Sequence, residues 1–137
     1  MNRYLLDTNI CVHLIKDEFS IKQKIAQIGT KSCLLSEITL AELLFGVENS
    51  APDRRQKNRQ NVENLQTLFQ GRILLIGEAL PEYARQKAAL RQKGRTIDDF
   101  DLLIGSTAIV YGLTLVTRNT RHFADLAGIK LENWIDA

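Results

Sequence analysis

The chain has 137 residues, a length that fits one domain with room for a hydrophobic core. Hydrophobic residues make up 45% and charged residues 25%, as in ordinary soluble globular proteins, and no apolar run is long enough to cross a bilayer. The net charge of +2 is too small to identify a nucleic-acid partner by itself.

Short apolar runs alternate with amphipathic segments along the chain. In chain order the pattern predicts a strand at 3–6, helices at 10–16 and 21–28, a strand at 32–35, helices at 39–48 and 52–69, a strand at 73–76, helices at 81–93 and 99–111, a strand at 113–117, a short helix near 123–126 and a possible strand at 129–131. Alternating strands and helices favour an α/β fold: one domain over residues 1–137, with a parallel sheet covered by helices on both faces.

Two features bear on the compartment. The predicted strand begins at once after Met1, which leaves no room for a signal peptide. Cys11 and Cys33 show no metal-binding spacing, so we expect reduced thiols in the core. We therefore expect a cytoplasmic protein that does not associate with membranes.

Three carboxylates stand almost alone within apolar stretches. Asp7 closes the run Tyr4-Leu5-Leu6, Glu42 interrupts an apolar helix, and Asp101 lies between Phe100 and Leu102-Leu103-Ile104. Acidic residues are rarely buried unless they are paired, hydrogen-bonded or bound to a metal. Three such residues would form a site if the fold brought them together.

The predicted sheet brings them to one edge. Asp7 directly follows the first strand, and Glu42 is expected in the first turn of the helix after the second strand. Asp101 is expected in the first turn of the helix that leads to the fourth strand, and Asn119 lies just beyond that strand. Strand ends and the helix starts that follow them share an edge in a parallel sheet, so all four residues are predicted to converge.

Each acid also has a structural interpretation. Asp7 could cap the helix that follows it. Thr39 and Glu42 have the spacing of a capping box, and Asp98 could cap the helix of Asp101. Capping does not require three acids at one edge, so the joint pattern favours a site.

The chemistry of such a site is constrained by charge. Close carboxylates repel by roughly 4 kcal/mol per pair at an effective dielectric constant near 20, so protons or a cation must offset them. Oxygen ligands indicate Mg²⁺ or Mn²⁺ and not zinc, and His13 and His122 have no ligand-like spacing. Gly105, one turn after Asp101, leaves room beside the carboxylate. These features are typical of metal-assisted phosphodiester hydrolysis.

Positive charge gathers in three places, which are Arg54, Arg55, Lys57 and Arg59; Arg85, Lys87, Arg91, Lys93 and Arg95; and Arg118, Arg121 and His122. The first two clusters fit solvated helix faces as well as a binding surface. The third adjoins Asn119, so a phosphate-binding role is favoured there.

Four segments together resemble one known family. They are Leu5-Leu6-Asp7-Thr8-Asn9, Glu37-Ile38-Thr39-Leu40-Ala41-Glu42-Leu43, Asp101-x-x-Ile104-Gly105 and Leu115-Val116-Thr117-Arg118-Asn119. They resemble the motifs of PIN-domain ribonucleases, and their order, spacing and total length are most similar to the VapC toxins of bacterial toxin–antitoxin pairs. The resemblance implies a three-layer α/β/α PIN fold, Mg²⁺-dependent cleavage of RNA, a homodimer, and a small VapB-like antitoxin that inserts a segment into the active-site groove.

The family's metal-binding acids correspond here to Asp7, Glu42 and Asp101. Thr8 and Asn9 match the polar residues that follow the first acid, and they are expected to position that acid or a metal-bound water.

The fourth acidic position of many members is Asn119 here, which argues against a second firmly bound metal. Asp98 and Asp99 could compensate through water, although Asp98 fits better as the start of a helix. Arg118 and Arg121 are expected to engage substrate phosphates.

Two other classes remain open. A catalytically silent PIN-like module could bind RNA or protein in the same groove, although it would not need all three acids. A phosphohydrolase could use Asp7 as a nucleophile, but Asn9 stands where a second aspartate would be expected. Surplus apolar residues on the predicted helices 52–69 and 81–93 also suggest a symmetric homodimer.

Overall fold

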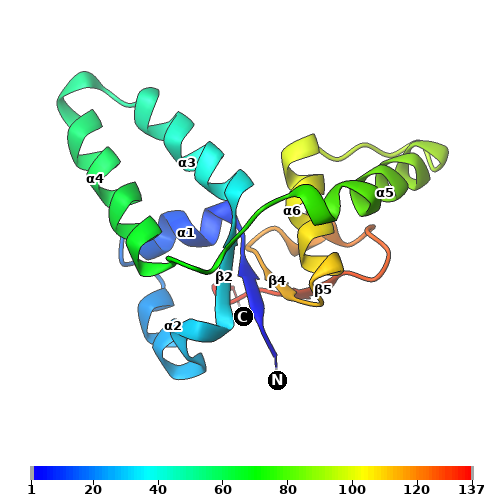
Figure 1. Cartoon of the computed structure of the whole chain (residues 1–137), viewed down its shortest axis with the longest axis horizontal. Coiled ribbons are helices and arrows are strands. Elements are labelled where there is room, and N and C mark those ends of the chain that lie inside the picture. Colours follow the sequence, from blue (N-terminus) through cyan, green and yellow to red (C-terminus); the bar gives the residue numbers. More distant parts are fainter. Residues whose placement is uncertain (1, 137) are drawn as a thin grey trace.

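The computed structural model describes residues 2–136 (Figure 1). Within them, five parallel strands form one sheet in the order β3-β2-β1-β4-β5. The strands are β1 (Tyr4–Leu6), β2 (Cys33–Ser36), β3 (Ile73–Leu74), β4 (Thr114–Val116) and β5 (Lys130–Glu132). The central strand β1 aligns Leu5 with Leu34 on one side and Leu115 on the other. The predicted parallel sheet is confirmed, including its fifth strand.

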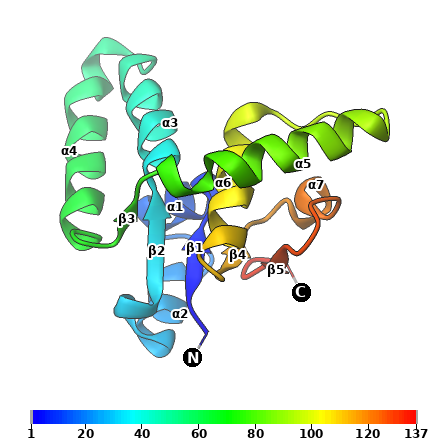
Figure 2. The same cartoon turned by 45° about the vertical axis from the view of Figure 1, so that its right-hand side comes forward.

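Helices cover both faces of the sheet (Figure 2). They are α1 (Thr8–Ile15), α2 (Ile21–Ile28), α3 (Glu37–Glu48), α4 (Pro52–Leu68), α5 (Leu80–Gln92), α6 (Asp99–Val110) and α7 (Thr120–Phe123), with short 3-10 turns η1 (Thr30–Ser32) and η2 (Gly77–Ala79). Because side chains alternate along a strand, Tyr4 and Leu6 pack with α1–α4, whereas Leu5 packs with α5–α7. This is the predicted three-layer α/β/α arrangement.

The start of α3 differs from the prediction. The helix begins two residues earlier, at Glu37, because the Ser36 hydroxyl accepts a hydrogen bond of 3.1 Å from the amide of Ile38. Thr39 is therefore inside the helix, and the capping-box interpretation of Glu42 is wrong. Glu42 was predicted in the first turn of this helix, but it lies in the second turn of α3.

The predicted helix near 123–126 is also misplaced. The structure has α7 at Thr120–Phe123, directly after Asn119. Phe123 and Leu126 have helical spacing, but they are the end of α7 and part of the turn beyond it, and both are buried. Their apolar character reflects packing against α6 and not a helix of their own.

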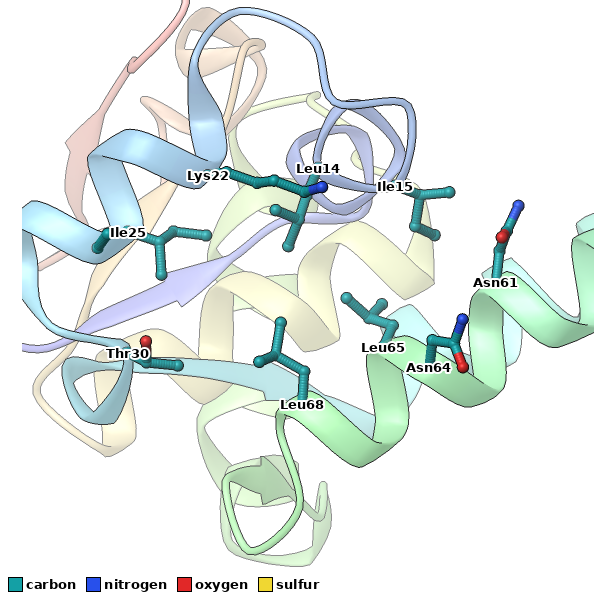
Figure 3. A pocket seen from close by; sticks show the side chains of 10 residues that line it. Leu14, Ile15, Lys22, Ile25, Thr30, Asn61, Asn64, Leu65 and Leu68 are labelled. Atoms are coloured by element: carbon teal, nitrogen blue, oxygen red, sulfur yellow. The ribbon is translucent and has the colours of Figure 1, made fainter.

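A hollow of about 530 Å³ lies between α1, α2 and α4 (Figure 3). Leu14, Ile25, Leu65 and Leu68 line it, with Lys22 among the polar residues around them. Among the described residues, no acid lines this hollow, so it is not a candidate for carboxylate chemistry.

Two further predictions concern the core and membranes. Cys11 and Cys33 are free, buried thiols, as predicted, and burial raises the pKa of Cys33 to about 11 and that of Cys11 further. Within residues 2–136, no helix combines the length and the apolar character needed to cross a bilayer.

Candidate active site

Asp7 lies at the end of β1 and is only 4% exposed. One carboxylate oxygen accepts a hydrogen bond of 2.8 Å from the amide of Thr8, and the other accepts one of 2.8 Å from the Thr117 hydroxyl. Burial nevertheless raises its pKa to about 6; the two hydrogen bonds oppose this shift, and the charges of Asp101 and Glu42 add to it. Asp7 does cap α1, as the structural interpretation predicted, but a cap has no need of such burial beside two other acids.

Glu42 reaches the same edge from α3. Its carboxylate accepts a hydrogen bond of 2.6 Å from the Thr8 hydroxyl, which in turn lies 3.2 Å from the hydroxyl of Thr39. Burial raises the pKa of Glu42, the Thr8 hydrogen bond lowers it, and the charges of Asp101 and Asp98 raise it again. Thr8 thus links the first two acids, because its amide contacts one and its hydroxyl the other.

Asp101 lies in the first turn of α6, as predicted. Asp98 caps this helix by accepting a hydrogen bond of 3.2 Å from the amide of Phe100. An oxygen of Asp101 lies 3.0 Å from Nε2 of His122 on α7. The spacing of His122 did not indicate a ligand, yet this histidine directly contacts a predicted site acid.

The three acids form an electrostatic cluster. The charge of Asp101 raises the pKa of both Asp7 and Glu42, and the charge of Glu42 raises that of Asp7. Among the described residues, however, no three acid, histidine or cysteine side chains lie close enough to form a preassembled metal-binding group. Mg²⁺ commonly binds one or two carboxylates and keeps several waters, so coupled acids with space between them fit this ion better than zinc.

A cleft of about 870 Å³ opens beside Asp101. Arg118, Asn119, Arg121 and His122 line it, which places the predicted fourth site position and both predicted phosphate ligands at its wall. Within residues 2–136, no carboxylate lies within ion-pair distance of Arg121. Asn119 precedes α7, and its side chain makes no capping hydrogen bond.

Arg118 is held in place by its neighbours. Its guanidinium forms an ion pair of 3.2 Å with Asp136 and lies 4.9 Å from the ring centre of Phe19. Its backbone amide donates to the side chain of Asn9, at 3.3 Å. A bound phosphate would therefore have to compete with Asp136 for Arg118, whereas no carboxylate of residues 2–136 competes for Arg121.

Thr117 is a site residue that the sequence analysis missed. It is fully buried, and its hydroxyl donates to Asp7 while accepting from the Asn9 side chain at 3.4 Å and from the Asn119 amide at 3.0 Å. It follows β4 directly, so the same sheet-edge argument that selected Asn119 would have found it. Asn9 lies at the same edge and contacts the Thr117 hydroxyl and the Arg118 amide.

Asp99 points elsewhere. Its carboxylate accepts hydrogen bonds from Lys87 at 2.8 Å and from the Tyr83 hydroxyl at 2.9 Å, both on α5, and these contacts lower its pKa. Asp98, and not Asp99, is among the neighbouring charges that raise the pKa of Glu42. The auxiliary role expected for Asp99 thus fits Asp98 better, in addition to the capping role of Asp98.

Comparisons with known proteins agree with this geometry. The PIN domain family model matches residues 4–129. The ribonuclease VapC2 of Rickettsia felis is 37% identical over 136 residues, which cover 96% of this chain and 97% of the relative. The tRNA(fMet)-specific endonuclease VapC of Shigella flexneri is 33% identical over 138 residues, which cover 98% of this chain and 99% of the relative.

The fold is similar over the same length. A chain in the crystal structure of VapBC2 from Rickettsia felis, bound to a DNA fragment from their promoter, superposes with a TM-score of 0.86 at 33% identity. The alignment covers 96% of this chain and 98% of that chain. This chain therefore belongs to the PIN-domain family, and its near full-length relatives within that family are VapC ribonucleases.

Proposed function

We propose that this chain is a Mg²⁺- or Mn²⁺-dependent endoribonuclease, the toxin of a VapBC-type pair in the cytoplasm, and that it hydrolyses RNA in the cleft beside Asp101. One observation supports this above all. Asp7, Glu42 and Asp101 come from three distant segments, yet the charge of Asp101 raises the pKa of the other two, and Asp101 lines a cleft that also contains Arg118 and Arg121. Such a cluster repels a phosphodiester unless a cation is bound.

Each acid has a separate proposed role at the cation. Asp7 and Asp101 would hold the cation, directly or through its waters, and Glu42 would complete its coordination shell or orient a bound water. When bound, the ion supplies a more acidic water and stabilises negative charge on the phosphate. Thr8 and Thr117 keep the carboxylates oriented through the hydrogen bonds described above.

Hydrolysis requires that a water oxygen bond to phosphorus while a phosphorus–oxygen bond of the RNA backbone breaks and the leaving oxygen gains a proton. The Asn119 amide, at the cleft wall, would orient the attacking water. Arg121 would bind a neighbouring phosphate because it has no internal partner among the described residues. Asn119 contributes no charge, so we propose one firmly bound metal ion.

RNA is proposed as the substrate because the relatives' names state it: VapC2 of Rickettsia felis is a ribonuclease, and VapC of Shigella flexneri acts on tRNA(fMet). A VapB-like antitoxin is proposed as partner because a close structural neighbour was solved as VapBC2 with promoter DNA.

A homodimer is also proposed. Of the predicted helices at 52–69 and 81–93, the first carries one exposed large apolar side chain, Leu68, but the most exposed ones are Phe45 on α3 and Leu75 after β3, at 69% and 67%. Leu44, Leu80 and Phe100 are also exposed. Exposed apolar side chains of this size favour contact with a second copy.

Cleavage of an end-labelled RNA tests the proposal. We expect internal cuts with Mg²⁺ or Mn²⁺, no cuts with EDTA, and loss of most activity in Glu42→Gln. A silent binding module would bind the RNA in a gel-shift experiment without cutting it under any metal condition, and that result would contradict the proposal.

A further inference from the structure

The three acids differ in how they are held. Two of them accept hydrogen bonds from threonine hydroxyls on the sheet edge, as described above. For Asp101, the side chain within hydrogen-bond distance is that of His122, on a different element. An ionised carboxylate can only accept, so this hydrogen bond requires the form of His122 that has a hydrogen on Nε2.

The contact depends on a glycine. Asp101 and Gly105 lie one turn apart on α6. A Cβ atom at Gly105 would lie 2.5 Å from Cδ1 of Leu126 and 3.5 Å from Cδ1 of Phe123. The bare backbone of Gly105 therefore lets these two buried side chains pack against α6, and His122 precedes one of them, with its ring 5.5 Å from that of Phe123.

The pair contributes little to stability. The His122 and Asp101 side chains are 44% and 29% exposed, and partly exposed pairs typically add little to the free energy of unfolding. A hydrogen bond to one oxygen of a carboxylate does, however, fix its orientation and leaves the other oxygen available. Such supporting bonds to metal ligands typically change metal affinity or activity by roughly 10–100-fold.

We propose that His122 is a positioning residue that orients the Asp101 carboxylate toward the metal ion, and that Gly105 places it there. The inference rests on the proposed function, because it assumes that Asp101 holds the ion. A competing view has the imidazole occupying Asp101 and excluding the ion. The two views predict opposite changes in metal affinity when His122 is removed.

Calorimetric titration of the whole chain with Mn²⁺, in the absence of RNA, measures that affinity. His122→Ala is expected to weaken Mn²⁺ binding by roughly 10–100-fold. His122→Gln should restore most of the affinity, because its amide nitrogen reaches about as far as Nε2, whereas the shorter His122→Asn should not. His13→Ala is the matched control: His13 pairs with Glu18 at 2.9 Å, away from the acids, and its loss should leave Mn²⁺ affinity unchanged.

A second pair of variants tests the glycine. Gly105→Ala should weaken Mn²⁺ binding in the same direction, because the new methyl group displaces Leu126 and moves α7 away from Asp101. Adding Leu126→Ala removes the displaced atoms and should recover part of the affinity. If Gly105→Ala binds Mn²⁺ as the wild type does, the role assigned to this glycine is wrong.

The outcomes separate this inference from the proposed function. Unchanged or tighter Mn²⁺ binding by His122→Ala would overturn the positioning role, even if the variant melts at a lower temperature. If the wild type also cuts RNA with Mg²⁺, the nuclease function survives that result. If the wild type neither binds Mn²⁺ nor cuts RNA, both proposals fail.

Discussion

Replacing Asp7 with asparagine should stabilise the metal-free protein. Burial raises the pKa of Asp7 from its ordinary 3.8 to about 6, so keeping it ionised at pH 8 costs about 3 kcal/mol of folding free energy. Asparagine avoids that cost, but its amide nitrogen cannot accept the hydrogen bond from the Thr117 hydroxyl. Loss of this hydrogen bond lowers the free energy of unfolding by about 1 kcal/mol. We expect a net gain of about 1–2 kcal/mol, or roughly 3–8 °C in Tm for a chain of this size.

The gain should depend on pH with a defined sign. An acid whose pKa is raised by folding contributes full stability below 3.8 and loses it as the pH rises to about 6. The advantage of Asp7→Asn should therefore be largest at pH 8 in EDTA and shrink as the pH falls from 6 towards 4. Mg²⁺ should stabilise the wild type and have less effect on the variant.

Thermal unfolding in EDTA at several pH values measures both effects. Glu63→Gln, on the exposed face of α4, serves as the control and should change Tm little at any pH. If Asp7→Asn melts below the wild type at pH 8 in EDTA, keeping the buried carboxylate ionised does not cost the folding free energy inferred from its raised pKa, and the prediction is refuted.

Three further predictions test single features of the site and surface. Asn119→Asp should strengthen metal binding or add a second site in a Mn²⁺ titration. Asn119→Ala should reduce cleavage more than it reduces Tm. If Asn119→Ala lowers Tm but leaves cleavage intact, Asn119 is only a turn residue. Thr117→Val should lower both Tm and cleavage, because three hydrogen bonds around Asp7 are lost, whereas the buried control Thr107→Val should affect only Tm. Phe45→Glu should convert a dimer into a monomer in sedimentation experiments, and a wild-type monomer at micromolar concentration would contradict the proposed interface.

The sequence predicted the sheet, and with it the edge where Asp7 and Asn119 lie, because strands buried on both faces leave a clear apolar pattern. Glu42 was assigned to the correct helix but the wrong turn, since the cap is Ser36 and not Thr39. Glu42 nevertheless reaches the predicted edge of the sheet, where it contacts Thr8. Helix starts depend on single hydrogen bonds, which apolar periodicity does not reveal.

The contact of His122 with Asp101 could not have been found in the same way. Its place beside Asp101 depends on how closely α7 approaches α6, and that distance is set by the missing side chain of Gly105. The space at Gly105 was predicted, but the packing of Leu126 and Phe123 into it was not. Likewise, nothing in the local pattern predicted that Arg118 pairs with Asp136, because the two residues meet only through the tertiary fold.

Two nearby aspartates on α6, Asp99 and Asp101, test most directly whether the acid cluster cuts RNA with a metal ion. Asp101 faces the cleft, whereas Asp99 is bound to Lys87 and Tyr83 on α5. Cleavage of an end-labelled RNA at fixed Mg²⁺ should fall at least roughly 100-fold in Asp101→Asn and remain near the wild-type rate in Asp99→Asn, with both variants folded. Wild-type cleavage by Asp101→Asn at the same Mg²⁺ concentration would contradict the account.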